Sequence, residues 1–155
     1  MEIRSVGVIG AGQMGNGIAH VCALAGYDVL ITDIKQEALD SALTQIDRNM
    51  SRQVSRGLIT DEEKTAAQER IRSTLTLTDL GQMDLVIEAA TERETVKDAI
   101  FKELVPALKP ETILTSNTSS ISITRLASRT DRPERFMGFH FMNPVPVMQL
   151  VELIR

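Results

Sequence analysis

The chain has 155 residues, of which 43% are hydrophobic and 25% are charged, and these values predict one folded domain rather than a disordered segment. Its formal net charge is −4, so the overall charge gives no reason to expect a nucleic acid or an anionic membrane as a partner. No apolar run approaches the roughly 18 residues of a membrane-spanning helix, no signal peptide precedes the first predicted strand, and the single Cys22 cannot form an internal disulfide. We therefore expect a cytoplasmic protein that does not associate with membranes.

The beginning of the chain predicts a strand, a helix and a second strand. A short apolar run at 6–9 is followed at once by glycines, which is typical of a buried strand. Residues 16–25 predict a helix that ends at Gly26, and 28–32 predict the second strand. Strand, helix and strand within some thirty residues form a βαβ unit, in which the two strands pair in parallel.

A long amphipathic helix is predicted next, because apolar residues recur at intervals of three and four. These are Leu39, Leu43, Ile46, Met50 and Val54. Gly57 ends this helix, and Thr60 and Glu63 have the spacing of a capping box for another helix, which we expect to run to about residue 71.

Strands and helices alternate through the remaining residues. The sequence predicts strands over 75–77, 85–89, 112–115, 135–140 and 149–154, and helices over 95–105 and 122–127. Pro106 closes the first of these helices, and two prolines, Pro144 and Pro146, force a turn between the last two strands. We therefore predict an α/β fold, a doubly wound and mostly parallel sheet with helices on both faces.

The segment 10–15 reads G-A-G-Q-M-G, directly after a predicted strand and directly before a predicted helix. In such a loop Gly10 permits the tight turn, Gly12 lets the backbone approach a pyrophosphate, and Gly15 lets the helix pack closely on the sheet. The N–H groups of the helix start, at Gln13 and Met14, would face the phosphates. This is the signature of a Rossmann-type dinucleotide site.

An acidic residue supports the same interpretation. Asp33 ends the second predicted strand, 18 residues beyond Gly15, where a ribose-binding acid is expected. Its carboxylate would accept hydrogen bonds from the ribose hydroxyls and repel a 2′-phosphate, which favours NAD over NADP, although the nearby Lys35 weakens this preference. The alternative, a glycine-rich structural turn with a surface aspartate, leaves the combination unexplained.

His20 and His140 are the only histidines. His20 lies within the first predicted helix, where a packed or surface role is the simpler interpretation. His140 lies at the carboxyl end of a predicted strand, where ligands bind in open α/β sheets. If the last two strands pair antiparallel about position 146, Glu152 stands directly opposite His140 and on the same face, and could orient it as a general base. An exposed glutamate on an edge strand is the alternative.

The polar turn 116–120, Ser-Asn-Thr-Ser-Ser, follows another predicted strand at its carboxyl end. Its side chains could bind a substrate carbonyl or a nicotinamide amide, and one serine could instead cap the helix that begins near Ser122. No G-x-S-x-G elbow surrounds these serines, which argues against a hydrolase, and no spacing of histidines and cysteines predicts a metal site.

Together with the glycine loop and the Ser-Asn-Thr-Ser-Ser turn, the segment 138–148, G-F-H-F-M-N-P-V-P-V-M, resembles the L-3-hydroxyacyl-CoA dehydrogenases, and above all their bacterial 3-hydroxybutyryl-CoA members. The resemblance covers the whole chain and implies reversible hydride transfer between NAD and C3 of a 3-hydroxyacyl-CoA, as in fatty-acid and butyrate metabolism. It implies that His140 is the base, that Glu152 supports it, and that Ser119 binds the substrate oxygen near the nicotinamide.

The resemblance also implies three further cofactor contacts, Glu92, Lys97 and Asn143. Taken alone, Glu92 and Lys97 would be read as solvated charges of a helix. Arg48, Arg52 and Arg56 recur every four residues and form a basic stripe, although like charges at that spacing repel each other. Binding of CoA phosphates by Arg52 and Arg56, with Ser51 as the match to the family's serine, would explain the stripe, and ordinary solvated arginines are the alternative.

The resemblance further implies a second, mainly helical domain beyond Arg155, which closes the substrate cleft and forms a homodimer, and which these residues do not include. We therefore expect residues 1–155 to be an NAD-binding domain of a dehydrogenase. A non-catalytic dinucleotide-binding protein is the alternative from another class, and a β-hydroxyacid or sugar-nucleotide dehydrogenase is the alternative among enzymes.

Overall fold

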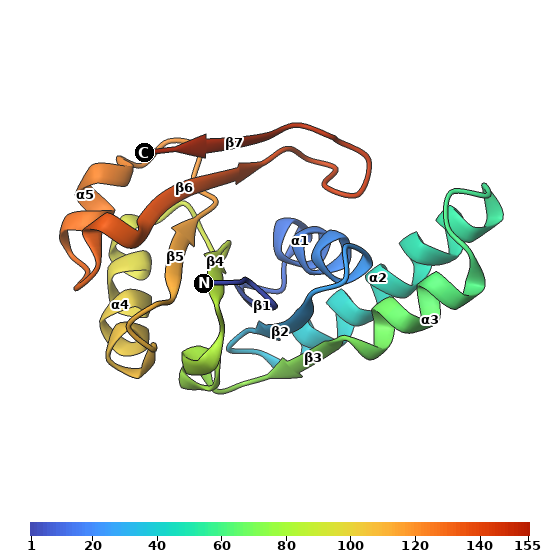
Figure 1. Ribbon diagram of the computed structural model, residues 1–155, viewed down its shortest axis with the longest axis horizontal. Coiled ribbons are helices and arrows are strands. Elements are labelled where there is room, and N and C mark those ends of the chain that lie inside the picture. Colours follow the sequence, from blue (N-terminus) through green and yellow to red (C-terminus); the bar gives the residue numbers. More distant parts are fainter.

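The computed structural model describes residues 1–155 and contains a single seven-stranded sheet (Figure 1). The strands are β1 (Ser5–Ile9), β2 (Asp28–Thr32), β3 (Ile71–Thr74), β4 (Leu85–Glu88), β5 (Ile113–Ser116), β6 (Phe136–Phe141) and β7 (Val151–Ile154). Their order across the sheet is β3-β2-β1-β4-β5-β6-β7, and every neighbouring pair is parallel except β6 and β7. The chain order reverses direction between β1 and β4, so the ligand crevice of this fold is expected there.

Helices cover both faces of the sheet. They are α1 (Gln13–Leu24), α2 (Gln36–Ser55), α3 (Asp61–Glu69), α4 (Glu94–Leu104) and α5 (Ile123–Ser128), with short 3₁₀ turns at Leu77–Gln82, Val105–Ala107 and Pro133–Arg135. Buried residues of α1, α2 and α3 form one hydrophobic core with alternate strand residues, and those of α4 and α5 form a second core on the opposite face. The predicted doubly wound Rossmann-type sheet is confirmed.

The pair α2 and α3 extends away from the sheet, as Figure 1 shows in cyan and green. Three residues of the predicted apolar stripe, Leu39, Ile46 and Met50, are buried under α2, whereas Leu43 is 37% exposed and Ala42 fills its place. The expected capping box also forms, because the Thr60 hydroxyl accepts from the Glu63 N–H while the Glu63 carboxylate accepts from the Thr60 N–H.

Several predicted elements differ from the structure in their bounds, most by one residue, and the last strand begins at Val151 rather than at residue 149. The predicted strand at 75–77 is wrong, because the edge strand is Ile71–Thr74. Two of its four residues, Arg72 and Ser73, are polar and exposed, so the sequence shows no apolar pattern of a strand there. Helix α3 stops at Glu69 rather than near residue 71, because β3 already begins at Ile71. The first helix begins at Gln13, three residues earlier than expected, because the glycine loop itself enters the first helical turn.

None of the helices combines the length and the hydropathy that crossing a lipid bilayer requires.

Candidate functional site

The glycine loop forms a tight turn between β1 and α1. Gly10 has φ of 101°, and a Cβ there would come within 2.7 Å of the Ala89 carbonyl oxygen. A Cβ on Gly15 would lie 1.7 Å from the Gly10 carbonyl oxygen, so helix and loop can approach only because both residues are glycines. No side chain caps α1 and no acidic residue lies in its first turn, which leaves this positive helix end available to an anion.

Asp33 lies beside this loop, at the carboxyl end of β2. Its two carboxylate oxygens accept hydrogen bonds from the backbone N–H groups of Ala11 (2.9 Å) and Lys35 (3.1 Å). The aspartate thus fixes the loop to β2, a role that its sequence position did not suggest. A carboxylate has about four acceptor positions, so capacity remains for ribose hydroxyls.

A cavity of about 530 Å³ adjoins Asp33 on the side of the sheet edge and of α4. Apolar side chains dominate its wall, and they include Ile34, Leu75, Leu77, Val96 and Ile100. Sequence reasoning missed this apolar cavity, because Leu75 and Leu77 were assigned to a strand. An apolar slot next to an acidic side chain at the end of β2 suits the flat adenine ring of a dinucleotide.

A second cavity, of about 270 Å³, lies on the other side of the glycine loop, over the ends of β4 and β5. Its lining includes Gln13, Met14, Glu92, Lys97 and Asn117. An apolar slot, an anion-binding helix end and a polar cavity therefore follow one another along the crevice. This sequence of environments fits adenosine, pyrophosphate and nicotinamide in turn, so the residues present fit NAD.

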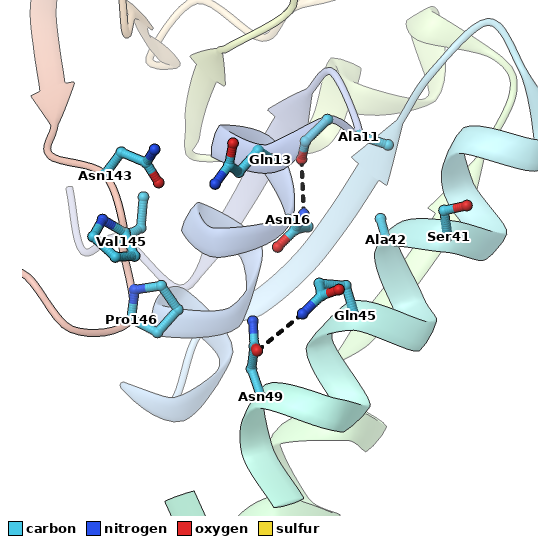
Figure 2. Close-up of a pocket in the computed structure, with 12 residues that line it drawn as sticks. Ala11, Gln13, Asn16, Ser41, Ala42, Gln45, Asn49, Asn143, Val145 and Pro146 are labelled. Carbon is cyan, nitrogen blue, oxygen red and sulfur yellow. Dashed lines mark hydrogen bonds between the residues drawn. The ribbon is translucent and has the colours of Figure 1, made fainter. Parts of the chain in front are cut away.

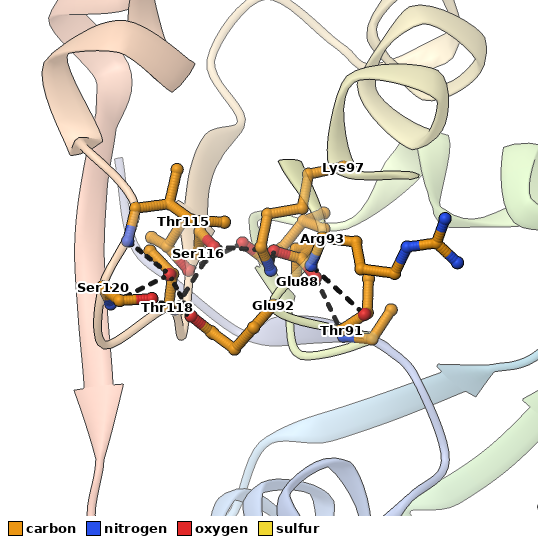
Figure 3. A network of polar contacts seen from close by, with 12 residues as sticks. Glu88, Thr91, Glu92, Arg93, Lys97, Thr115, Ser116, Thr118 and Ser120 are labelled. Carbon is orange, nitrogen blue, oxygen red and sulfur yellow. Dashed lines mark hydrogen bonds and ion pairs between the residues drawn. The ribbon is translucent and has the colours of Figure 1, made fainter. Parts of the chain in front are cut away.

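Charged and hydroxyl side chains form a network behind the second cavity (Figure 3). Lys97 is only 1% exposed and forms an ion pair of 2.5 Å with Glu88, which is fully buried. The solvated position that its sequence suggests for Lys97 is therefore wrong. Glu88, at the end of β4, was not singled out from the sequence at all.

Glu92 lies at the rim of the same cavity and accepts hydrogen bonds of 2.8 Å from the hydroxyls of Thr118 and Ser120. Partial burial raises the pKa of this carboxyl, but the two hydroxyl donors and the charge of Lys97 outweigh burial, so the pKa lies below its usual value. Glu92 is thus ionised at neutral pH. The turn that carries Ser119 is fixed to β4–α4 through these bonds, and Ser119 itself is exposed.

His140 and Glu152 face each other across the antiparallel pair β6–β7, in the register expected from the sequence. The ring Nδ1 of His140 lies 3.5 Å from the Glu152 carboxylate, and the two side chains are 23% and 51% exposed. Because Nδ1 faces the carboxylate, Nε2 is the ring nitrogen left to meet a ligand. His140 is held further by its strand neighbour, since the Phe141 N–H donates to the side-chain oxygen of Asn117 at 2.8 Å.

The β6–β7 loop reaches over α1 and closes a third cavity of about 510 Å³ (Figure 2). Asn143, Val145 and Pro146 line it from the loop, and Gln45 and Asn49 line it from α2. The loop rests directly on α1, because a Cβ on Gly17 would come within 2.7 Å of the Cβ of Val145. Asn143 is exposed in this loop and precedes a cis-proline, Pro144.

The predicted basic stripe lies on the outer half of α2. Arg52 and Arg56, but not Arg48, line a groove of about 510 Å³ between α2 and the β6–β7 loop. Ser51 faces α3 instead, where its hydroxyl accepts a hydrogen bond of 2.9 Å from Lys64. The structure therefore brings two arginines of the stripe to a groove that continues from the Asn143 cavity.

The other sequence candidates lie apart from these cavities. His20 is fully buried between α1 and α2, which agrees with a packed structural residue. No cluster of three or more His, Cys, Asp or Glu side chains is placed to hold a metal ion.

Comparison with known proteins gives one family. Residues 5–155 match the family model described as the NAD-binding domain of 3-hydroxyacyl-CoA dehydrogenase. A 3-hydroxybutyryl-CoA dehydrogenase of Bradyrhizobium diazoefficiens is 61% identical over 153 residues, which are 99% of this chain and 52% of that relative.

Solved structures agree with this match. FadB2 of M. tuberculosis superposes on the whole chain with a TM-score of 0.96 at 44% identity, over 55% of its own length. The (S)-3-hydroxybutyryl-CoA dehydrogenase PaaH1 of Ralstonia eutropha superposes on 98% of the chain with a TM-score of 0.95 at 45% identity, over 54% of its length. The chain thus spans about half the length of the relatives that it matches.

Proposed function

Because this chain belongs to the NAD-binding domain family of the 3-hydroxyacyl-CoA dehydrogenases, we propose that it supplies the cofactor site and the catalytic base of an NAD-dependent oxidoreductase. The reaction is the interconversion of a (3S)-3-hydroxyacyl-CoA, such as 3-hydroxybutyryl-CoA, and its 3-oxoacyl-CoA. The substrate's CoA portion follows the groove that Arg52 and Arg56 line.

The observation that carries the proposal is the pairing of His140 with Glu152 next to a complete dinucleotide crevice. A protein that only binds the dinucleotide needs the crevice but has no use for a paired imidazole and carboxylate at its edge. An imidazole beside a carboxylate is the arrangement of an oriented general base.

The nearby residues have complementary tasks in this reaction. When bound, NAD would supply the hydride acceptor for C3 of the hydroxyacyl group. His140 takes the proton of the C3 hydroxyl on Nε2, and the Glu152 carboxylate stabilises the resulting imidazolium. Ser119 donates a hydrogen bond to the same substrate oxygen, and Asn143 binds at the nicotinamide ribose. In the reverse direction His140 returns the proton to that oxygen.

The cofactor is held by the residues of the crevice. The N–H groups at Gly12, Gln13 and Met14 bind the pyrophosphate, and Asp33 binds the adenosine ribose, which favours NAD over NADP. Glu92 and Lys97 bind on the nicotinamide side. We expect the second half found in the relatives to close the cleft and exclude water, and the whole protein to be a cytoplasmic homodimer.

The test joins this chain to the C-terminal half of the Bradyrhizobium relative and follows NADH consumption with acetoacetyl-CoA. We expect turnover, and we expect His140→Gln to reduce kcat about a thousandfold while NADH affinity changes less than about twofold. His20→Gln, which alters the other histidine, is the matched control and should keep the parent kcat. Undiminished turnover in His140→Gln would refute its role as base, and firm NADH binding without any turnover would favour a non-catalytic dinucleotide-binding protein.

A further inference from the structure

The buried carboxylate of Glu88 joins three segments that surround the second cavity (Figure 3). One of its oxygens accepts from the Lys97 ammonium of α4 at 2.5 Å and from the Ser116 hydroxyl at the end of β5 at 2.6 Å. The other oxygen accepts from the Ala90 N–H of the β4–α4 loop at 2.8 Å. Every donor around this carboxylate is thus provided by an element that borders the cavity.

Three charged groups gather on this side of the crevice. Lys97 and Glu92 line the cavity, and Glu88 lies directly behind Lys97. Lys97 pairs directly with Glu88 and also attracts Glu92 electrostatically, so two carboxylates and one ammonium leave this group with one excess negative charge. Glu92 lies at the rim, where its hydrogen bond from Ser120 is exposed, whereas the side chain of Glu88 is fully buried and its charge is screened little by solvent.

The part of the dinucleotide that meets this group follows from the topology. Asp33 and the apolar cavity lie on the β2 side of the glycine loop and take the adenosine half, so the nicotinamide half extends toward β4 and β5. The oxidised nicotinamide ring carries one positive charge and the reduced ring carries none. The pyrophosphate has the same charge in both states and does not discriminate between them.

We propose that Glu88 is a positioning residue that sets the balance between binding of oxidised and reduced cofactor. The carboxylate of Glu88 neutralises the charge of Lys97, so this ammonium does not repel the positively charged oxidised nicotinamide. Lys97 nevertheless stays in place to bind the cofactor. The excess negative charge then favours the oxidised ring. This inference rests on the cofactor site of the proposed function and adds a residue that does not itself touch the cofactor.

The experiment compares the dissociation constants of NAD⁺ and NADH for this chain and for Glu88→Gln, which keeps the shape of the side chain but removes its charge. We expect the ratio of the NAD⁺ constant to the NADH constant to rise on the order of tenfold, as one unit charge across such a cleft gives at an effective dielectric constant of about 20. Most of the change should be weaker binding of NAD⁺.

Ser116→Ala is the matched control, because it removes a hydrogen bond to the same Glu88 oxygen without changing any charge. It should shift both dissociation constants by a similar factor. If Glu88 has a purely structural role, Glu88→Gln should likewise shift the NAD⁺ and NADH dissociation constants by a similar factor and leave their ratio unchanged. That result would overturn the inference.

Lys97→Met provides an independent test if Glu88→Gln fails to fold. Removing the ammonium leaves Glu88 without a cation, so the ratio of the NAD⁺ constant to the NADH constant should fall below that of the unaltered chain. An unchanged or raised ratio would contradict the inference. If the unaltered chain binds neither NAD⁺ nor NADH, both the proposed function and this inference fail. If it binds them but the ratio of the two constants is the same in the charge-altering variants, only this inference is refuted.

Discussion

His20 shows how strongly burial constrains one residue of this domain. It has no exposed surface, its Nε2 lies 2.8 Å from the side-chain oxygen of Gln53 on α2, and its Nδ1 has no partner. Since the Gln53 oxygen can only accept, Nε2 carries the proton and Nδ1 is a bare acceptor in the core. Burial lowers the pKa of this imidazole below 6.5, although the bond to Gln53 opposes the change.

This lowered pKa predicts a stability that depends on pH. In the unfolded chain His20 gains its proton as the pH falls through about 6.5, whereas the folded protein gains it only at lower pH. The unfolded state then binds more protons, so the free energy of unfolding should fall as the pH drops from neutral through about 6.5. Thermal unfolding over this range should show a smaller decrease in His20→Gln than in the unaltered chain. Parallel pH profiles of the two proteins would contradict this prediction.

At the same scale, the pairing of His140 with Glu152 was easier to predict than the contacts of the residues around it. His140 and Glu152 could be paired from parity alone, because two prolines fix where the strands turn. The pairing of Glu88 with Lys97 could not be predicted in this way. From the sequence alone, a glutamate at the end of an apolar strand and a lysine within an amphipathic helix are both expected to be exposed to solvent. Their burial depends on β4, β5 and α4 converging, which only the folded chain shows.

Among the elements, those with local signals were predicted well. The capping box at Thr60 and the turns after α1 and α2 depend on residues close in sequence, and the structure has them where they were expected. The edge strand β3 has no such signal, because it pairs only with β2 and half of its residues face solvent. Leu75 and Leu77 have the apolar alternation of a strand for another reason, since they line the cavity beside Asp33.

The capping box predicts a measurable contribution of a single element. Thr60→Ala removes the hydroxyl that accepts from the Glu63 N–H, so the free energy of unfolding should fall by about 1 kcal/mol in denaturant titrations. Thr65→Ala is the matched control, because Thr65 is exposed within α3 and alanine favours a helix there. Equal stability of the two variants would show that the cap contributes nothing to α3.

At the scale of the whole molecule, the cavities form a continuous path. The cavity beside Asp33, the glycine loop and the second cavity lie along the carboxyl ends of the strands. The Asn143 cavity and the arginine groove continue this path between α2 and the β6–β7 loop. The doubly wound, mostly parallel sheet was predictable from alternating strands and helices, but the order of its strands was not predicted. The groove was not, because it requires the loop to fold back over α1 (Figure 1).

The groove predicts which arginines recognise CoA. Replacing Arg52 and Arg56 together by alanine should weaken CoA binding about tenfold in calorimetric titrations at low salt, and added salt should reduce the difference. Arg48→Ala is the matched control, because Arg48 belongs to the same stripe but does not line the groove. A comparable loss in Arg48→Ala would mean that the stripe acts only through its overall charge.

The contact between Gly17 and Val145 links the proposed cofactor site and the proposed substrate groove through a single small residue. The helix whose start is proposed to bind the phosphates also supports, one turn later, the loop that lines the arginine groove. Few side chains other than that of glycine should therefore be tolerated at position 17, although this residue lies outside both proposed sites. Even one added methyl group would displace the β6–β7 loop while leaving the start of α1 intact. A variant at this position should therefore lower turnover more than it lowers the affinity for the cofactor.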